Sequence, residues 1–234
     1  MSHAADHGDA GDAAGDVRAA GGFLVLEGID GAGKSSQVAP LADWLRSLGR
    51  EVVTCRDPGA TPTGDAIRAI LLDRRDLRLD AIAEMLLYMA ARAQLVSEVI
   101  RPALARGAWV LSDRYLLANV VYQGHAGGID PDVVRRVGDV ATGGLGPDLV
   151  LLLDIDLATA ARRMNRPLDR LESRGDEYRG RLRAGYRAEA DREPGRIVVV
   201  DATRGPDAVQ ESLRDAILAR WPELRTAAAA RWDA

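Results

Sequence analysis

The clearest chemistry in this sequence lies in the segment GIDGAGKSS, which begins at Gly28. Its first eight residues fit the pattern G-x-x-x-x-G-K-[ST], in which glycines let backbone N–H groups curl around an anion. Lys34 is the only lysine among 31 basic residues, and a compact ammonium fits among curled amides where a wide, planar guanidinium would not. We therefore predict a site for a nucleoside triphosphate, with Lys34 on the β- and γ-phosphates and Ser35 holding Mg²⁺. The predicted triphosphate contacts are Gly28, Ile29, Asp30, Gly31, Ala32, Gly33, Lys34, Ser35 and Ser36.

Two further polar pairs follow apolar runs. Asp113 and Arg114 come after the third run, where the carboxylate is suited to ordering a Mg²⁺-bound water and the guanidinium to holding a phosphate. Without other motifs, an ordinary surface ion pair is the better interpretation. Arg56 and Asp57 end the second run before a Pro-Gly turn, which alone predicts only a turn.

These residues need elements to position them, and the chain alternates short apolar runs with segments of helical periodicity. This order predicts an α/β fold with a five-stranded, mostly parallel sheet covered by helices on both faces. Ligands of such sheets bind at the carboxyl ends of the strands. The long helix is expected to end or kink near Pro102. The predicted strands are 23–27, 51–55, 108–113, 148–154 and 196–201, and the predicted helices are 38–48, 64–73, 80–107, 135–141, 158–164 and 207–221.

Length and composition bound the class of protein. The 234 residues, 47% hydrophobic and 28% charged, suit one globular domain, which we expect over 21–225 between a disordered arm at 1–20 and a tail at 226–234. The net charge of −4 argues against broad nucleic-acid binding. No apolar run is long enough for a membrane span, and the single cysteine, Cys55, forms no internal disulfide, so a cytoplasmic protein is expected.

Arginine is concentrated in one segment. Residues 162–183 contain eight arginines, where the average of the chain predicts about three. Such an excess in an acidic protein indicates either a basic lid over phosphates or a solvated basic helix, and the composition does not choose between them.

The phosphate-binding pattern occurs in several classes of protein. GTPases commonly recognise guanine with an N-K-x-D segment, which cannot exist here because Lys34 is the only lysine. Motor-type ATPases are larger, so a small kinase remains.

Taken together, six segments resemble the thymidylate kinase family, whose members pass a phosphoryl group from ATP to dTMP. The resemblance covers about Phe23 to Trp221 and implies a P-loop nucleotide-kinase fold with ATP as co-substrate and Mg²⁺ as cofactor. It implies a homodimer, for which the long helix at 80–107 is a plausible surface. The segments are EGIDGAGKSS, RDPGATPTG, LLYMAARAQL, SDRYLLANVVYQG, LLLDI and VVDAT.

The resemblance also implies roles for individual residues. Asp30 corresponds to the acid that faces the 3′-hydroxyl of the acceptor, and Arg56 and Arg114 to the arginines that hold the dTMP phosphate. Tyr88 stands where most members stack phenylalanine on thymine, and Arg92 where a side chain hydrogen-bonds the base. The residues implied to line the base and deoxyribose are Asn119, Tyr122 and Gln123.

The resemblance places transition-state arginines in the lid, because the segment between Gly28 and Gly33 has none. The candidates for these transition-state arginines are Arg163, Arg166 and Arg170. Asp57 departs from the family, in which many bacterial members have glutamate. Two other functions remain open: a P-loop kinase for another nucleotide or deoxynucleoside, and a nucleotide-binding module without turnover.

Overall fold

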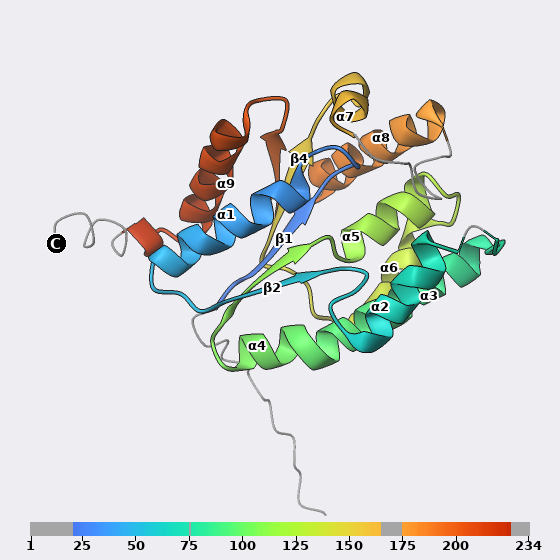
Figure 1. The fold of residues 1–234 in the computed structure, drawn as a ribbon, viewed down its shortest axis with the longest axis horizontal. Helices are drawn as coiled ribbons and strands as arrows, with labels where there is room; N and C mark the ends of the chain where they lie inside the picture. The colour runs from blue at the N-terminus through green and yellow to red at the C-terminus, as the bar shows by residue number, and fades with distance from the viewer. Residues whose placement is uncertain (1–20, 75, 165–174, 226–234) are drawn as a thin grey trace, which may run out of the picture.

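The computed structural model describes residues 21–74, 76–164 and 175–225. Their order of elements alternates strands with helices, as the hydrophobic pattern predicts (Figure 1). The strands are β1 (Phe23–Glu27), β2 (Val52–Arg56), β3 (Trp109–Asp113), β4 (Leu149–Asp154) and β5 (Ile197–Asp201). The helices are α1 (Lys34–Ser47), α2 (Pro62–Leu72), α3 (Ala81–Leu95), α4 (Arg101–Ala105), α5 (Leu116–Asn119), α6 (Pro131–Thr142), α7 (Leu157–Arg163), α8 (Asp176–Arg192) and α9 (Pro206–Arg220), with π-helical turns η1 (Val96–Ile100) and η2 (Val120–His125).

The five strands form one sheet in the order β2-β3-β1-β4-β5, and every pair is parallel. The central strands are mostly apolar because both of their faces are covered: all five residues of β1 are buried, whereas only two of the five residues of edge strand β5 are. The predicted strands are confirmed to within one residue at each end.

Helices cover both faces of the sheet (Figure 1). Helices α1 and α9 pack side by side on one face, α1 against β1, β2 and β3 and α9 against β4 and β5. On the other face α4 contacts β3 and α8 contacts β4 and β5, as right-handed crossovers require. In the described part of the chain, no helix is both long and apolar enough to cross a membrane.

The long helix differs from its prediction. Helical backbone runs from Ala81 to Ala105, but the departure from α geometry is the π turn η1 before Pro102, not a break at the proline. Pro102 follows this π turn directly, so the irregular turn lies where a proline inside a continuous helix removes one backbone hydrogen bond.

Two helical segments were not predicted from periodicity. Segment α5–η2 follows β3 directly and carries several predicted site residues. Helix α8 begins inside the arginine-rich segment and carries three of its arginines, Arg179, Arg181 and Arg183. The predicted lid at 162–183 is described only at its two ends, and the arm at 1–20 and the tail at 226–234 lie outside the described residues.

Candidate active site

The loop between β1 and α1 has a backbone that requires glycine at two positions. Gly28 has φ 140°, and a Cβ there would lie 2.5 Å from the carbonyl oxygen of Leu153. Gly31 has φ 85°, and its Cβ would lie 2.4 Å from the carbonyl oxygen of Ala160. The loop therefore packs directly against β4 and α7 and leads into the N-terminus of α1, where backbone N–H groups favour an anion.

Lys34 is the first residue of α1, and its side chain folds back across this loop. Its Nζ donates to the carbonyl oxygens of Gly28 (2.9 Å) and Ile29 (3.0 Å) and lies 3.9 Å from Asp30 Oδ1. Burial and the nearby Arg114 lower the pKa of Lys34 to about 8. The ammonium is thus held inside the curl of the backbone, as the preference for lysine over arginine predicts.

A cavity of about 650 Å³ opens in front of the loop, and we call it the loop cavity. Of the predicted triphosphate contacts, Gly28, Ile29 and Ala32 do not line it and form the buried floor of the loop. The lining residues are Asp30, Gly31, Gly33, Lys34, Ser35, Ser36, Arg56, Asp57, Arg68, Asp113, Arg114, Arg163 and Met164.

Ser35 and Asp113 meet on the wall of the loop cavity. Ser35 Oγ donates to Asp113 Oδ2 at 2.7 Å, although the residues are 78 positions apart in the sequence. A hydroxyl and a carboxylate are the hard oxygen ligands that Mg²⁺ prefers, and Mg²⁺ needs few protein ligands when phosphates supply others. The donor set therefore fits the predicted metal.

Arg114 has an unusual backbone and a side chain whose two terminal nitrogens are both hydrogen-bonded. Its φ of 71° places a non-glycine residue in the left-handed region, a conformation that persists only where the surroundings impose it. One terminal nitrogen donates to Asp30 Oδ1 (2.6 Å) and the Tyr122 hydroxyl, and the other to the Gly28 carbonyl and the Tyr186 hydroxyl. The sequence suggested a guanidinium free to hold a phosphate, whereas the structure holds it in a network.

Asp30 is the acidic centre of that network. It accepts from Arg114 and from the Tyr122 hydroxyl at 2.8 Å. Burial alone would raise the pKa of Asp30, but the charges of Arg114 and Lys34 outweigh burial and hold it well below its usual range. Asp30 is therefore ionised at neutral pH and ties the phosphate loop to η2.

A second cavity, of about 110 Å³, continues from the first, and we call it the side cavity. Four residues line both cavities and mark their junction: Asp30, Asp57, Arg68 and Arg114. The side cavity is lined by Asp30, Asp57, Pro58, Arg68, Leu72, Tyr88, Arg92, Arg114, Ala118, Asn119, Tyr122 and Gln123. All of the predicted acceptor-binding residues except Arg56 are among them.

The far end of the side cavity is built on α3. Tyr88 and Arg92 are four residues apart and face the cavity from one side of the helix. Arg92 is only 1% exposed, and its Nε bonds Asp57 Oδ2 at 2.5 Å. Its other nitrogens contact the sulfur of Met89 and, at 3.3 Å, the Tyr115 carbonyl. Asp57 thus forms a buried ion pair with the predicted base-binding arginine.

The remaining wall comes from α5 and η2. Asn119 Nδ2 donates to Gln123 Oε1 at 2.7 Å, and Gln123 Nε2 donates to Glu84 Oε1 at 2.9 Å. All three side chains are buried. The three amide and carboxylate groups form one continuous chain that starts at the cavity and ends on α3.

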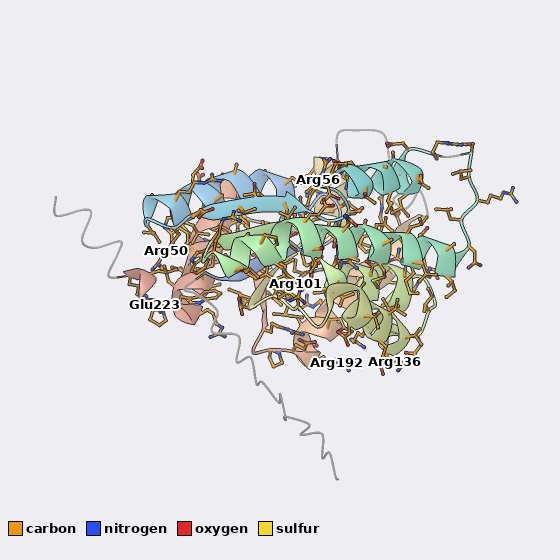
Figure 2. The ribbon with its side chains drawn as sticks, turned by 90° about the horizontal axis from the view of Figure 1, so that it is seen from below. Arg50, Arg56, Arg101, Arg136, Arg192 and Glu223 are labelled. Carbon is orange, nitrogen blue, oxygen red and sulfur yellow. The ribbon has the colours of Figure 1, made fainter. Side chains whose placement is uncertain are left out.

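The other predicted arginines lie at the rim or outside the described residues. Arg56 is over half exposed and pairs with Asp65, and Figure 2 shows it beside α2, far in that view from Arg136 and Arg192. Arg163 lines the loop cavity while donating to the carbonyls of Ala202, Thr203 and Arg204. Arg166 and Arg170 lie outside the described residues.

Four residues that shape the site were not predicted from the sequence: Glu27, Glu84, Tyr186 and Arg68. Glu27, fully buried, accepts from the backbone N–H of Tyr115 and from the Tyr186 hydroxyl. Glu27 could have been found because it is an acid at the end of an apolar strand. Glu84 could have been found because it lies four residues before Tyr88 and eight before Arg92, on the same face of the helix. Nothing local marked Tyr186 or Arg68.

Similarity to known proteins points to one family. A family model described as thymidylate kinase matches residues 26–213. The chain is 43% identical over 193 residues to a thymidylate kinase of Rhodopirellula baltica, covering 82% of this chain and 78% of that protein. It is 46% identical over 186 residues to one of Desulforudis audaxviator, covering 79% and 84%. The crystal structure of thymidylate kinase from Ehrlichia chaffeensis superposes with a TM-score of 0.69 at 26% identity, covering 84% of this chain and 98% of that one.

Proposed function

The chain belongs to the thymidylate kinase family and catalyses the ATP-dependent phosphorylation of dTMP to dTDP, and we propose that ATP binds in the loop cavity and dTMP in the side cavity. The main support for these two binding sites is that the two cavities meet. The large cavity in front of the phosphate loop and the smaller side cavity share Asp30, Asp57, Arg68 and Arg114. Two phosphate groups that enter from opposite sides would meet at that junction.

The side cavity suits a pyrimidine with a polar edge. Tyr88 supplies an aromatic surface, Arg92 has N–H donors beyond the one paired with Asp57, and Asn119 Oδ1 is a buried acceptor. Thymine offers a carbonyl to a donor and an N3–H to an acceptor. We therefore propose that Arg92 and Asn119 contact the base. Tyr122 and Asp30 are proposed to contact the deoxyribose, and Gln123 to form part of the cavity wall next to Asn119.

Alignment and charge neutralisation account for the proposed chemistry. An oxygen of the acceptor phosphate bonds to the γ-phosphorus of ATP while the bond to the β-phosphate oxygen breaks, which gives ADP and dTDP. The acceptor phosphate is already ionised, so no strong base is required. Lys34 would neutralise the transferring group, and Arg114 and Arg56 would orient the acceptor phosphate. Arg68 lines both cavities and is a further candidate for that phosphate.

Ser35 and Asp113 are proposed to hold Mg²⁺, on the strength of their hard oxygen atoms on the cavity wall. When bound, the ion would supply positive charge to the β- and γ-phosphates. Asp113 would act directly or through an ordered water.

We propose that the basic segment 162–183 serves as the lid of the loop cavity. Support comes from Arg163 and Met164, which line the cavity at the described end of this segment. Arg163 is therefore the lid arginine that can be argued from its position, and Arg166 and Arg170 stay predictions from the family. The arm at 1–20 and the tail at 226–234 are proposed to lie outside the kinase domain.

A homodimer is proposed through α3. Ile82 and Leu86, one turn apart on α3, are 46% and 49% exposed, and Val140 on neighbouring α6 is 84% exposed. A second copy of this chain would remove these side chains from water. Leu86→Glu should then convert the dimer to a monomer in light scattering.

The proposed cytoplasmic location rests on the lack of a possible internal disulfide.

An acceptor panel tests the function. ADP release is coupled to NADH oxidation at fixed ATP, with dTMP, dUMP, dCMP, dGMP, dAMP and thymidine as acceptors. We expect the highest kcat/KM for dTMP. Equal turnover of thymidine would indicate a nucleoside kinase, and ATP binding without ADP release would indicate a non-catalytic module.

A further inference from the structure

The side cavity ends in a chain of three buried side chains, Glu84, Gln123 and Asn119. Their exposed fractions are 2%, 3% and 2%. Glu84 comes from α3 and does not line the cavity, whereas Gln123 and Asn119 come from η2 and α5 and do. The hydrogen bonds of 2.9 and 2.7 Å leave no room for water between the members.

The chemistry of the first member fixes the direction of the whole chain. A carboxylate oxygen can only accept a hydrogen bond, so Glu84 requires the NH₂ group of Gln123. The carbonyl oxygen of Gln123 must then face Asn119, which answers with its own NH₂ group. Asn119 is thereby oriented with its Oδ1 atom directed away from Gln123.

Asn119 Oδ1 is buried and finds no hydrogen-bond donor within the described residues. A buried acceptor without a partner costs about 1–3 kcal/mol, so this atom is best explained by a ligand that donates to it. Asn119 lines the side cavity, and both polar groups of Gln123 are already engaged. Asn119 is therefore the amide that meets the base.

Two kinds of pyrimidine differ in the hydrogen-bonding groups that they offer at this edge. Uracil and thymine carry a carbonyl at C4 and a donor at N3, whereas cytosine carries an amino group at C4 and an acceptor at N3. The donor groups of Arg92 and the acceptor of Asn119 together match the first pattern and oppose the second.

We propose that Glu84 is a positioning residue that sets the polarity of this chain and thereby makes the acceptor site select 4-keto over 4-amino pyrimidine nucleotides. The inference rests on the proposed binding of the acceptor base in the side cavity. Glu84 does not line the cavity, so its role in base selection depends on the two amides, Gln123 and Asn119, that connect it to the base.

Glu84→Gln tests the proposal because it keeps the shape and removes the fixed direction. A glutamine at 84 can donate to Gln123 Oε1, which lets both amides turn over and presents Asn119 Nδ2 to the base. The readout is the ratio of kcat/KM for dUMP to that for dCMP, two substrates that differ only at the base edge. We expect this ratio to fall about tenfold, the value of one matched hydrogen bond.

Two controls separate polarity from general damage. The ratio of kcat/KM for dTMP to that for dUMP should stay within about twofold, since both bases present the same edge. Glu98→Gln on η1 makes the same chemical change at an exposed side chain outside both cavities and should change neither ratio.

A reversal experiment follows from the same logic. In the double variant Glu84→Gln, Asn119→Asp, a carboxylate at 119 accepts whatever the direction of the chain, so the preference for dUMP over dCMP should return. If Glu84→Gln does not fold, Gln123→Leu interrupts the chain at its centre and should lower the same ratio.

An unchanged ratio of dUMP to dCMP in a folded Glu84→Gln or Gln123→Leu enzyme would overturn the proposal. The wild-type enzyme is assayed first. If it phosphorylates none of these nucleotides, the proposed function fails, whereas wild-type discrimination that survives the loss of Glu84 contradicts only the role of Glu84.

Discussion

Arg114 and Asp30, 84 residues apart in the sequence, form an ion pair of 2.6 Å at the junction of the two cavities. The Tyr122 hydroxyl donates to the second oxygen of the same carboxylate at 2.8 Å and accepts from Arg114. The pair connects the phosphate loop, the end of β3 and η2. A change at Asp30 should therefore reach both substrates.

Asp30→Asn should lower kcat about 100-fold, because the Arg114 guanidinium loses its closest counter-charge and, with it, its orientation toward the proposed site of the acceptor phosphate. Steady-state kinetics with both substrates varied would measure this loss. Asp43→Asn, which breaks the exposed pair with Arg46 on α1, is the matched control and should behave like wild type. Near-normal kcat in Asp30→Asn would contradict the role of the pair.

Lys34→Ala should reduce phosphoryl transfer by a factor of 10² or more, in the range of lost transition-state donors. Lys34→Arg should not restore activity, because a planar guanidinium does not fit between the carbonyl oxygens of Gly28 and Ile29. Single-turnover assays measure the transfer, and circular dichroism checks that the fold is kept. Substantial activity in Lys34→Arg would show that charge alone suffices.

Activity should depend on the protonation of Lys34. Burial and Arg114 lower its pKa to about 8, so the ammonium is lost as the pH rises through that value. We expect kcat/KM for ATP to fall above about pH 8, while kcat falls at higher pH because bound phosphates favour the charged form. The measurement is a pH series at saturating dTMP, and a kcat/KM that stays flat through pH 9 argues against the assignment.

Arg163→Ala should lower kcat by about tenfold with a smaller effect on the KM for dTMP, because its guanidinium lines only the loop cavity. Arg162→Ala is the matched control. Its side chain is exposed, bonds the Thr159 hydroxyl and does not line either cavity. Equal effects of the two substitutions would indicate a general loss of positive charge.

Tyr122→Ala should weaken the preference for dTMP over its ribonucleotide analogue, since it removes the ring that we propose to fill the space beside the sugar. Tyr122→Phe keeps the ring and loses only the hydroxyl bound to Asp30, so it should keep the preference while lowering kcat. Competition assays with both nucleotides measure the ratio. An unchanged ratio in Tyr122→Ala would exclude the steric role.

The sequence by itself determined the strands, the order of the elements and the phosphate loop. Apolar runs such as 23–27 predict buried strands because both faces of a central parallel strand must be covered. The glycines and Lys34 predict their own geometry because the conformations and the charge that they supply are local properties. The helical face shared by Tyr88 and Arg92 followed from their spacing alone.

Only the tertiary structure decided which side chains meet. Glu27 and Tyr186 are 159 residues apart, and Glu84 and Gln123 are 39 apart. Their contacts depend on how α8 and η2 pack against the sheet and α3, which no local period encodes. The same holds for Arg114, whose sequence context suggests a free cation but whose packing gives it four partners. Local sequence fixes the backbone of each element, whereas the partners of a buried polar group are set by whichever distant segments share its interior.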